Sequence, residues 1–381
     1  MNFIGINYSK SENCSSRCYE NERKSKLFRM FIFVCVICLF NILFSSCNST
    51  KNKIDEKYRS GVVLILNQYY YTLTLPNGKA FYLAGDSDGN IINFEADPDS
   101  ARNCMVAATG TGFFISEDGK IATNKHVASR TVSDKDAVRV TKQILNKLER
   151  FLDSQNDSCE SIKELCQVQY SRSTDVNERA KIVQVFNYME EKIKKNNEII
   201  RELKYIDPAD ADFEYHSTLK VAYNGTFVKS VDDMYPCTLR DTANQDLAII
   251  QLNSKQTPPD KYVFSVPEKN MLEHYSFGEY LSRMVGSDKN EQLYMIGFNR
   301  GFSMAVTEEG IYSQCTEGSI NQTQKDIIQY NINTEPGSSG SPVLNRRGQL
   351  VAINFAGYRD AQSFNYGVKE KHLYDLIQKE K

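Results

Sequence analysis

The sequence predicts a mostly β protein, a sandwich or a barrel, into which a hairpin of two α-helices is inserted. Short runs rich in β-branched and aromatic residues recur after residue 58, separated by Gly, Asn, Asp and Pro turns. Between residues 134 and 205 glycine is absent, charge increases, and apolar residues recur every three or four positions, as in amphipathic helices. The 381 residues are 41% hydrophobic and suffice for one large domain or two ordinary ones. The net charge of −2 favours no polyanionic partner, so we expect no nucleic acid to bind.

The first 47 residues are predicted to be a targeting segment. Basic residues at 23–26 precede an apolar run at 30–44, and small residues follow up to Cys47, as in a secretory signal peptide. The apolar run has 15 residues, which is short for a helix that crosses a membrane.

The end of this segment, FSSC, resembles a lipobox, which implies cleavage before Cys47 and attachment of a lipid to that residue. We therefore expect a lipoprotein, anchored to a membrane through Cys47 in the periplasm or at the cell surface, with residues 48–57 as a polar tether. A secreted protein, or a chain held by an uncleaved N-terminal helix, is the alternative. Met30 is an alternative start, although that start would remove the basic flank. Each of these alternatives places the body of the protein outside the cytoplasm.

Five cysteines follow Cys47 in the sequence. Outside the cytoplasm cysteines can pair, and an odd number leaves at least one free or bonded to another chain. Cys159 and Cys166 are seven residues apart, which on one helix is about 10.5 Å of rise and too far for a disulfide. No C-x-x-C occurs after Cys47, so we expect no structural zinc site. We also expect no cofactor.

The strands before the insert are predicted from β-branched or aromatic runs that end at turn residues. The first run, SGVVLIL, is typical of a buried strand, and later runs are rich in Tyr and Leu. We predict strands at 60–66, within 67–105, at 109–115 and at 121–123, with turns at 76–78, 86–89 and 117–120.

The insert, residues 134–205, is predicted to be a helical hairpin. Asp175 and Glu178 have the spacing of a capping box at the start of the second helix, and Pro208 follows its end. We expect the hairpin to pack against the body or to act as a solvated spacer; an arm for a substrate or regulatory partner is the alternative. Its predicted apolar faces are formed by Ile182, Phe186, Met189 and Ile193, and by Ile144, Leu148 and Phe151.

After Pro208 the strand pattern resumes and continues almost to the end of the chain. We predict a closing helix at 371–378. The predicted strands are 219–223, 226–228, 246–252, 292–298, 303–306, 327–332, 343–344, 350–355 and 364–368.

The strongest functional signal is a G-x-S-G pattern at 337–340. Glycines there let the backbone turn sharply and present N–H groups to a developing oxyanion. A serine hydroxyl is a weak nucleophile unless a base and an orienting carboxylate accompany it. His126 and Asp246 precede Ser339 in that order, in the segments IATNKHV and QDLAII.

The spacing of these three residues becomes interpretable once the insert is subtracted. In a known Ser-His-Asp triad the intervals are about 45 and 93 residues. Here Asp246 and Ser339 are 93 apart, and His126 and Asp246 are 120 apart, of which the insert supplies 72 and leaves 48. Ser338 and Ser341 are rival serines, but the two glycines favour Ser339.

The segments TGTGFFISEDGKIATNKHV, NQDLAIIQL and NTEPGSSGSPV make the chain resemble the trypsin-like serine proteases, closest to the bacterial HtrA and glutamyl-endopeptidase branches. The resemblance covers about residues 58–376 apart from the insert, so we expect one protease domain at 58–381. It implies two six-stranded antiparallel β-barrels, with His126 as general base, Asp246 as its orienter and Ser339 as nucleophile. It also implies that the N–H groups of Gly337 and Ser339 form the oxyanion hole. Only 42 residues follow Ser339, so we expect no PDZ domain.

The resemblance also implies a substrate pocket formed by residues on both sides of the nucleophile in the sequence. We expect it to be lined by Asn333, Thr334, Asn354, Phe355 and Ala356. Asn333 is neutral, which disfavours cleavage after Arg or Lys, and Asn354 replaces the histidine of glutamyl endopeptidases. We therefore expect small or medium apolar residues before the scissile bond.

Two classes of function follow for this chain. The first is an active serine endopeptidase that acts on protein or peptide substrates outside the cytoplasm. The second is a catalytically silent binding or scaffold lipoprotein on a protease fold. A protease that is held inactive until a partner engages the insert is compatible with both.

Overall fold

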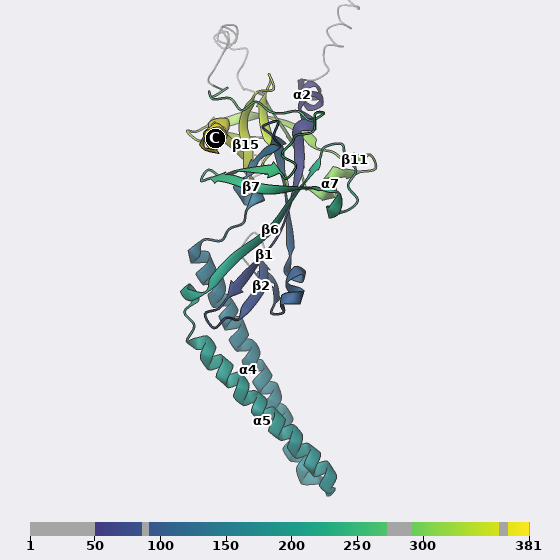
Figure 1. Ribbon diagram of the computed structural model, residues 1–381, viewed down its shortest axis with the longest axis vertical. Helices are drawn as coiled ribbons and strands as arrows, with labels where there is room; N and C mark the ends of the chain where they lie inside the picture. Colours follow the sequence, from purple (N-terminus) through teal and green to yellow (C-terminus); the bar gives the residue numbers. More distant parts are fainter. Residues whose placement is uncertain (1–49, 86–90, 273–291, 358–364, 381) are drawn as a thin grey trace, which may run out of the picture. The chain divides into compact units, whose positions relative to one another are not determined.

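Two closed, six-stranded antiparallel β-barrels form the body of the protein in the computed structural model, which describes residues 50–85, 91–272, 292–357 and 365–380 (Figure 1). The first barrel closes because β6 pairs with β1. In order around the barrel its strands are β1 (Val62–Thr74), β4 (Val106–Phe114), β5 (Lys120–Asn124), β8 (Leu247–Leu252), β7 (Tyr235–Ala243) and β6 (Asp212–Tyr223). The second contains β12 (Gln314–Thr323), β13 (Ile327–Tyr330), β16 (Asn365–Lys369), β15 (Leu350–Gly357), β14 (Pro342–Asn345) and β9 (Gln292–Gly297). The predicted fold class is confirmed.

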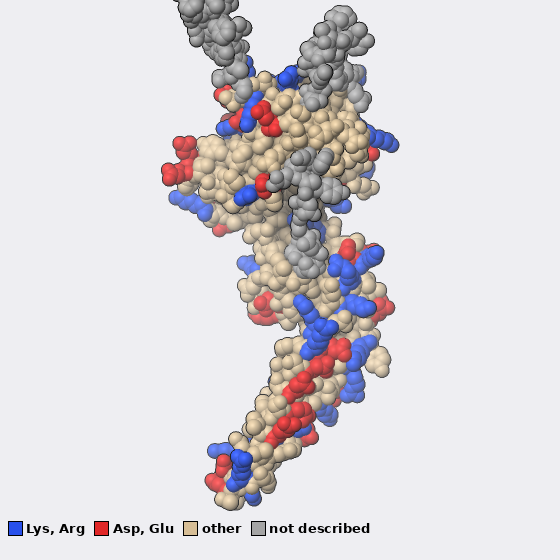
Figure 2. Space-filling model, turned by 180° about the vertical axis from the view of Figure 1, so that it is seen from behind, with Lys and Arg blue, Asp and Glu red and all other residues tan. Residues whose placement is uncertain are grey.

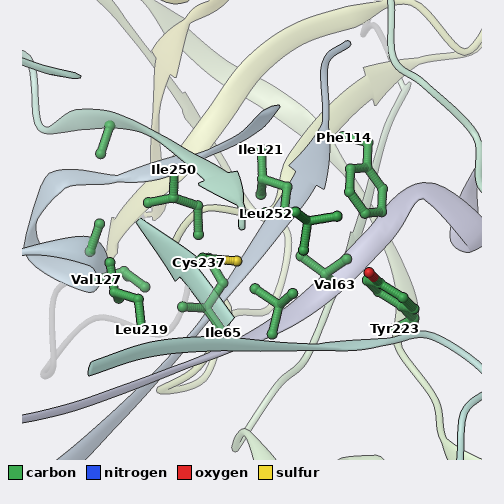
Figure 3. Close-up of a cluster of buried hydrophobic side chains, with 13 residues drawn as sticks. Val63, Ile65, Phe114, Ile121, Val127, Leu219, Tyr223, Cys237, Ile250 and Leu252 are labelled. Atoms are coloured by element: carbon green, nitrogen blue, oxygen red, sulfur yellow. The ribbon is translucent and has the colours of Figure 1, made fainter. Parts of the chain in front are cut away.

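Each barrel is filled by alternating apolar side chains, because residues two apart in a strand face the same side. In the first barrel Val63 and Ile65 of β1 face Ile121 and Ile250, and all four are fully buried (Figure 3). In the second barrel the core includes Leu293, Met295, Ile328, Tyr330, Val343 and Val351.

Strands β1 and β6 are longer than the barrel requires, and their outer halves form a separate sheet. Beyond the barrel β1 pairs with β2 (Ala80–Gly85), and β3 (Ile91–Glu95) adds to β2. Tyr71 of β1 faces Leu83 on one side and Tyr215 of β6 on the other. We call the resulting four-stranded sheet, in the order β3-β2-β1-β6, the outer sheet.

The predicted helical hairpin consists of α4 (Asp134–Arg172) and α5 (Val176–Lys204), which lie side by side (Figure 1). Ser133 caps α4 by accepting a hydrogen bond from Asp136 N–H, and Asp175 caps α5 through Asn177 N–H. The predicted capping box is absent, because Glu178 bonds the hydroxyl of Ser173 instead. The base of the hairpin shares a hydrophobic cluster with the outer sheet, formed by Tyr71, Leu73, Phe81, Leu83, Val140, Ile144, Leu145 and Leu203.

The surface of the hairpin carries charged side chains of both signs. Figure 2 shows acidic and basic side chains next to one another along its length. Near the base of the hairpin, Lys204 pairs with Glu149 across the two helices, at 3.0 Å. Phe151 does not belong to the buried face as predicted: its exposed fraction is 61%, and Leu152 packs against the cluster instead. Leu152 lies one helical turn after Leu148, which explains the exchange.

Two predicted strands are wrong. Residues 226–228 form a loop after Gly225, whose N–H donates to Ile311 C=O at 2.7 Å. Residues 302–305 form a helical turn, α7 (Phe302–Ala305), followed by the short pair β10 (Val306–Thr307) and β11 (Gly310–Ile311). Strands β7 and β12 were not predicted, because most of their residues are exposed or half-buried and show no apolar alternation.

The remaining elements are short. The predicted tether is helical where it is described, as α2 (Thr50–Tyr58), and the closing helix is α8 (Glu370–Glu380). The others within the described ranges are α3 (Lys125–Ala128) and the 3₁₀ helices Arg59–Gly61, Pro98–Cys104, Pro208–Asp210 and Val231–Asp233.

The predicted signal segment, Cys47 and the turn at 86–89 lie outside the described residues. No helix within the described ranges is long and apolar enough to span a membrane. The five cysteines after Cys47 are all described, and no disulfide joins any two of them.

Candidate active site

His126 and Asp246 meet at the ends of two neighbouring strands of the first barrel. Strands β5 and β8 are antiparallel partners, so His126 follows the end of β5 where Asp246 precedes the start of β8. His126 Nδ1 lies 2.6 Å from Asp246 Oδ2, and His126 N–H donates to Asp246 Oδ1 at 3.0 Å. The carboxylate therefore holds both the ring and the backbone of the histidine.

Asp246 adopts a left-handed backbone conformation, with φ of 59°. This region is uncommon for residues other than glycine, although Asp tolerates it better than most. Its carbonyl accepts from Lys125 N–H at 3.1 Å and from Asn124 Nδ2 at 3.0 Å. These bonds stabilise the conformation that directs the carboxylate towards His126.

The short helix α3, which carries His126, is held in place by contacts with β1 and β4. The buried amide of Asn67 donates to Val127 C=O at 2.9 Å and contacts the Tyr215 hydroxyl at 3.1 Å. Gly110 allows the close approach of this helix, since a Cβ there would lie 2.4 Å from Val127 Cγ1.

The segment before Ser339 forms a tight turn. Ser338 N–H donates to Glu335 C=O at 3.0 Å, with Pro336 and Gly337 as the central residues. Gly337 has φ of 100°, as the third position of a type II turn requires. A side chain at Gly337 would also place a Cβ 2.5 Å from Phe298 O.

The orientation of the Pro336–Gly337 peptide follows from one hydrogen bond. Pro336 C=O accepts from Arg300 N–H at 2.6 Å, and no peptide bond in the described ranges is cis. Because the C=O and N–H of a trans peptide point in opposite directions, Gly337 N–H points away from Arg300. Within the described part of the chain, the N–H groups of Gly337 and Ser339 have no acceptor.

Thr111 of β4 connects the first barrel to this turn. Its N–H donates to Ser339 C=O at 2.8 Å, and its hydroxyl donates to Gly337 C=O at 2.8 Å. The same hydroxyl accepts from Phe298 N–H at 3.0 Å. Thr111 is fully buried, so these bonds are shielded from water.

The three serines of the motif differ in accessibility. Ser338 and Ser341 are buried, with exposed fractions of 3% and 0%, whereas Ser339 is half-buried. Among the described residues, the Ser339 hydroxyl has no hydrogen-bond partner, His126 included. Catalytic hydrogen bonds are often long before substrate binds.

The predicted pocket residues lie in several environments. Asn333 is exposed and Phe355 is half-buried, while Thr334 donates to Asn365 Oδ1 at 2.7 Å. The side chain of Ala356, in β15, lies outside the described part.

Asn354 is buried beneath the serine turn. Its Nδ2 donates to Ser338 C=O at 3.0 Å, and its Oδ1 accepts from the Tyr330 hydroxyl at 2.7 Å. The amide therefore supports the turn, and a pocket role for these residues stays a prediction. Sequence reasoning did not identify Thr111, Asn67 or Tyr330; of these, only Thr111 lay in a quoted segment, TGTGFF.

Residues 210–353 match the family model of the trypsin-like peptidase domain. This part of the chain is similar to the trypsin-like peptidase domain. The matched range is less than half of the chain; it contains Asp246 and Ser339, while His126 lies before it. The two barrels have the trypsin-like arrangement, and the match supports a protease function.

Among solved structures, the serine endoprotease from Yersinia pestis is similar over 87% of this chain, with 12% identity and a TM-score of 0.40. The chain covers 66% of that protein. A similarity this low adds no argument about function.

Proposed function

We propose that this trypsin-like domain is a serine endopeptidase that hydrolyses peptide bonds through an acyl-enzyme on Ser339. The observation that carries the proposal is the 2.6 Å contact between His126 Nδ1 and Asp246 Oδ2. A carboxylate at Nδ1 holds the proton there and leaves Nε2 free to act as a base.

In the proposed reaction, His126 Nε2 takes the proton of Ser339 Oγ while that oxygen attacks the substrate carbonyl carbon. The carbonyl oxygen becomes an oxyanion, for which the N–H groups of Gly337 and Ser339 are donors that no described residue uses. Protonated His126 then gives its proton to the leaving amine, and the C–N bond breaks. Water, deprotonated by His126, attacks the acyl-enzyme and releases Ser339.

The exposure of the three serines supports Ser339 as the nucleophile, because Ser338 and Ser341 are buried. A fluorophosphonate probe tests this directly. We expect it to label the wild-type protein and the Ser341→Ala control, and not the Ser339→Ala variant. Folded wild-type protein that never reacts would favour the silent scaffold instead.

We propose further that the protein acts outside the cytoplasm, anchored by a lipid on Cys47. The basic and apolar segments before Cys47 and the FSSC sequence support this. Metabolic labelling with a fatty acid should be lost in Cys47→Ala. Labelling that persists in the variant would refute Cys47 as the lipidated residue, and wild-type protein that takes up no label would leave the secreted or helix-anchored alternatives.

The preference for small or medium apolar residues before the scissile bond is also proposed. Profiling on a peptide library tests it, and a strong basic or acidic preference would refute it. A regulatory partner at the hairpin is also proposed. To test it, peptidase activity is measured with and without a membrane extract, in the wild type and in a variant with a shortened hairpin.

A further inference from the structure

A cavity of about 650 Å³ lies on the side of His126 that faces the outer sheet. It borders His126 and Asp246 but neither Ser339 nor any residue of the predicted substrate pocket. Three parts of the chain supply the rest of its wall: the outer sheet, the segment between α3 and α4, and the first turns of α4. The cavity therefore lies where the outer sheet meets the base of the hairpin and the segment that leads into it.

One wall of the cavity is apolar and aromatic. Tyr69 and Tyr71 are buried, and the ring of Tyr71 lies 5.1 Å from that of Phe213. Leu83 and Val140 complete this wall from β2 and α4. The Tyr71 hydroxyl donates to Arg130 C=O at 2.6 Å, which fixes the backbone of Arg130 at the cavity edge.

Some charged side chains around the cavity have an ion-pair partner, and others have none among the described residues. Asp136 pairs with Arg139 at 3.4 Å, and Asp246 is occupied by His126. Arg130 and Lys125 also line the cavity, and neither makes an ion pair with a described residue. The cavity thus carries two cations that no described carboxylate neutralises.

Arg130 is the group that indicates a ligand. Its guanidinium lies over the Tyr69 ring, 5.5 Å from the ring centre, and its Nε is buried without a hydrogen-bond partner among the described residues. Arginine stays charged at all relevant pH values, and a buried donor without an acceptor is unfavourable. A carboxylate supplies both the negative charge and the hydrogen-bond acceptor, since its two oxygens match the planar guanidinium.

We propose that this cavity is a substrate subsite that binds a carboxylate at Arg130 and an adjacent apolar side chain against the Tyr71–Phe213 wall. The proposal rests on the endopeptidase function of Ser339. Because the cavity touches His126, the carboxylate belongs to the substrate segment within a few residues of the scissile bond. Its source is an acidic side chain or the α-carboxylate of a chain end. The base of the hairpin, through Arg139 and Val140, is then part of the substrate-binding surface.

Matched fluorogenic peptides test the subsite in the full-length protein. One series places Glu or Gln at each of the four positions on either side of a fixed cleavage site. A second series ends in a free carboxylate or in an amide at increasing distance from that site. We expect kcat/KM to be about 10- to 100-fold higher for the carboxylate at one position, which is the usual range for a hydrogen bond to a charged group.

Arg130→Gln should reduce the ratio of kcat/KM between the carboxylate peptide and its neutral counterpart to about one. Arg179→Gln is the matched control, because Arg179 also lies over a tyrosine ring, Tyr170 at 4.8 Å, but does not border the cavity. The control should keep the wild-type ratio. A wild-type protein that prefers no carboxylate at any position, or an Arg130→Gln variant that keeps the preference, would overturn the proposal.

The failure of the subsite and the failure of the endopeptidase function are distinguishable. Fluorophosphonate labelling of the wild type reports on the function without using the cavity. Binding of carboxylate and amide peptides to Ser339→Ala, followed by fluorescence anisotropy, reports on the cavity without cleavage. We expect at least tenfold tighter binding of the carboxylate peptide, and equal binding of both peptides would refute the subsite even in an active enzyme.

Discussion

Replacing Thr111 by Val removes one hydroxyl and keeps nearly the same shape. In the structure that hydroxyl donates to Gly337 C=O at 2.8 Å and accepts from Phe298 N–H at 3.0 Å. The variant leaves both buried backbone groups without partners, at a cost of about 1–3 kcal/mol each. Rotation of the Gly337 segment would relieve part of this cost, but it would also move a proposed oxyanion donor. Loss of one such donor typically lowers kcat by about 10²- to 10³-fold.

The assay for Thr111→Val combines the rate of fluorophosphonate labelling with the urea midpoint of unfolding. Thr257→Val is the control, because Thr257 is buried and donates a 2.7 Å bond to Ser116 C=O, outside the proposed catalytic machinery. Both variants should lose stability, and Thr111→Val alone should also lose labelling while still folded. A folded Thr111→Val protein that reacts at the wild-type rate would refute the role of Thr111 in holding the turn.

Four further predictions concern other parts of the molecule. Asp246→Asn should lower kcat by about 10³- to 10⁴-fold with little change in KM, since the wrong histidine tautomer is then favoured; steady-state kinetics on the folded variant test this, and a normal kcat contradicts it. Gly337→Ala should abolish labelling, because φ is 100° and the new Cβ would meet Phe298 O, whereas Gly78→Ala, with φ of 81° and open space, should lose only stability. Burial raises the pKa of Cys237 to about 12, so its thiol should stay protonated and unreactive towards iodoacetamide at pH 8 in the folded protein; rapid native alkylation would be inconsistent with this. Replacing residues 159–193 by a short Gly-Ser turn should leave the barrel stable and active, because only the base of the hairpin contributes to the hydrophobic cluster at the outer sheet. Loss of the cooperative urea unfolding transition would contradict this prediction.

The sequence was sufficient to predict those elements whose pattern lies within a short stretch of the chain. β1 follows from the run VVLIL, whose β-branched residues all proved buried, and the hairpin follows from its helical periodicity. The three proposed catalytic residues were identified by chain order and by subtraction of the insert. Each of these inferences uses residues that are close in sequence or intervals that can be counted.

The rest of the fold and site depends on contacts between distant residues. Thr226 accepts a hydrogen bond from Ile311 N–H at 2.8 Å, so its segment became a loop although its composition favours a strand. Thr111 and Gly337 are 226 residues apart in sequence, and no local pattern pairs them. Strand β7 has a single buried residue among its nine, Cys237, so it gives no periodic apolar signal.

The ends of the hairpin return to the same place, since Val140 at its start and Leu203 at its end share one hydrophobic cluster. The two ends of the insert therefore lie as close together as the ends of a short loop, whatever the length of the helices. Closing such a connection costs little conformational entropy, because the paired helices hold the two ends together. Hairpin length and barrel chemistry are thus independent variables: the helices can be lengthened or shortened at the far end while the residues beside His126 stay unchanged.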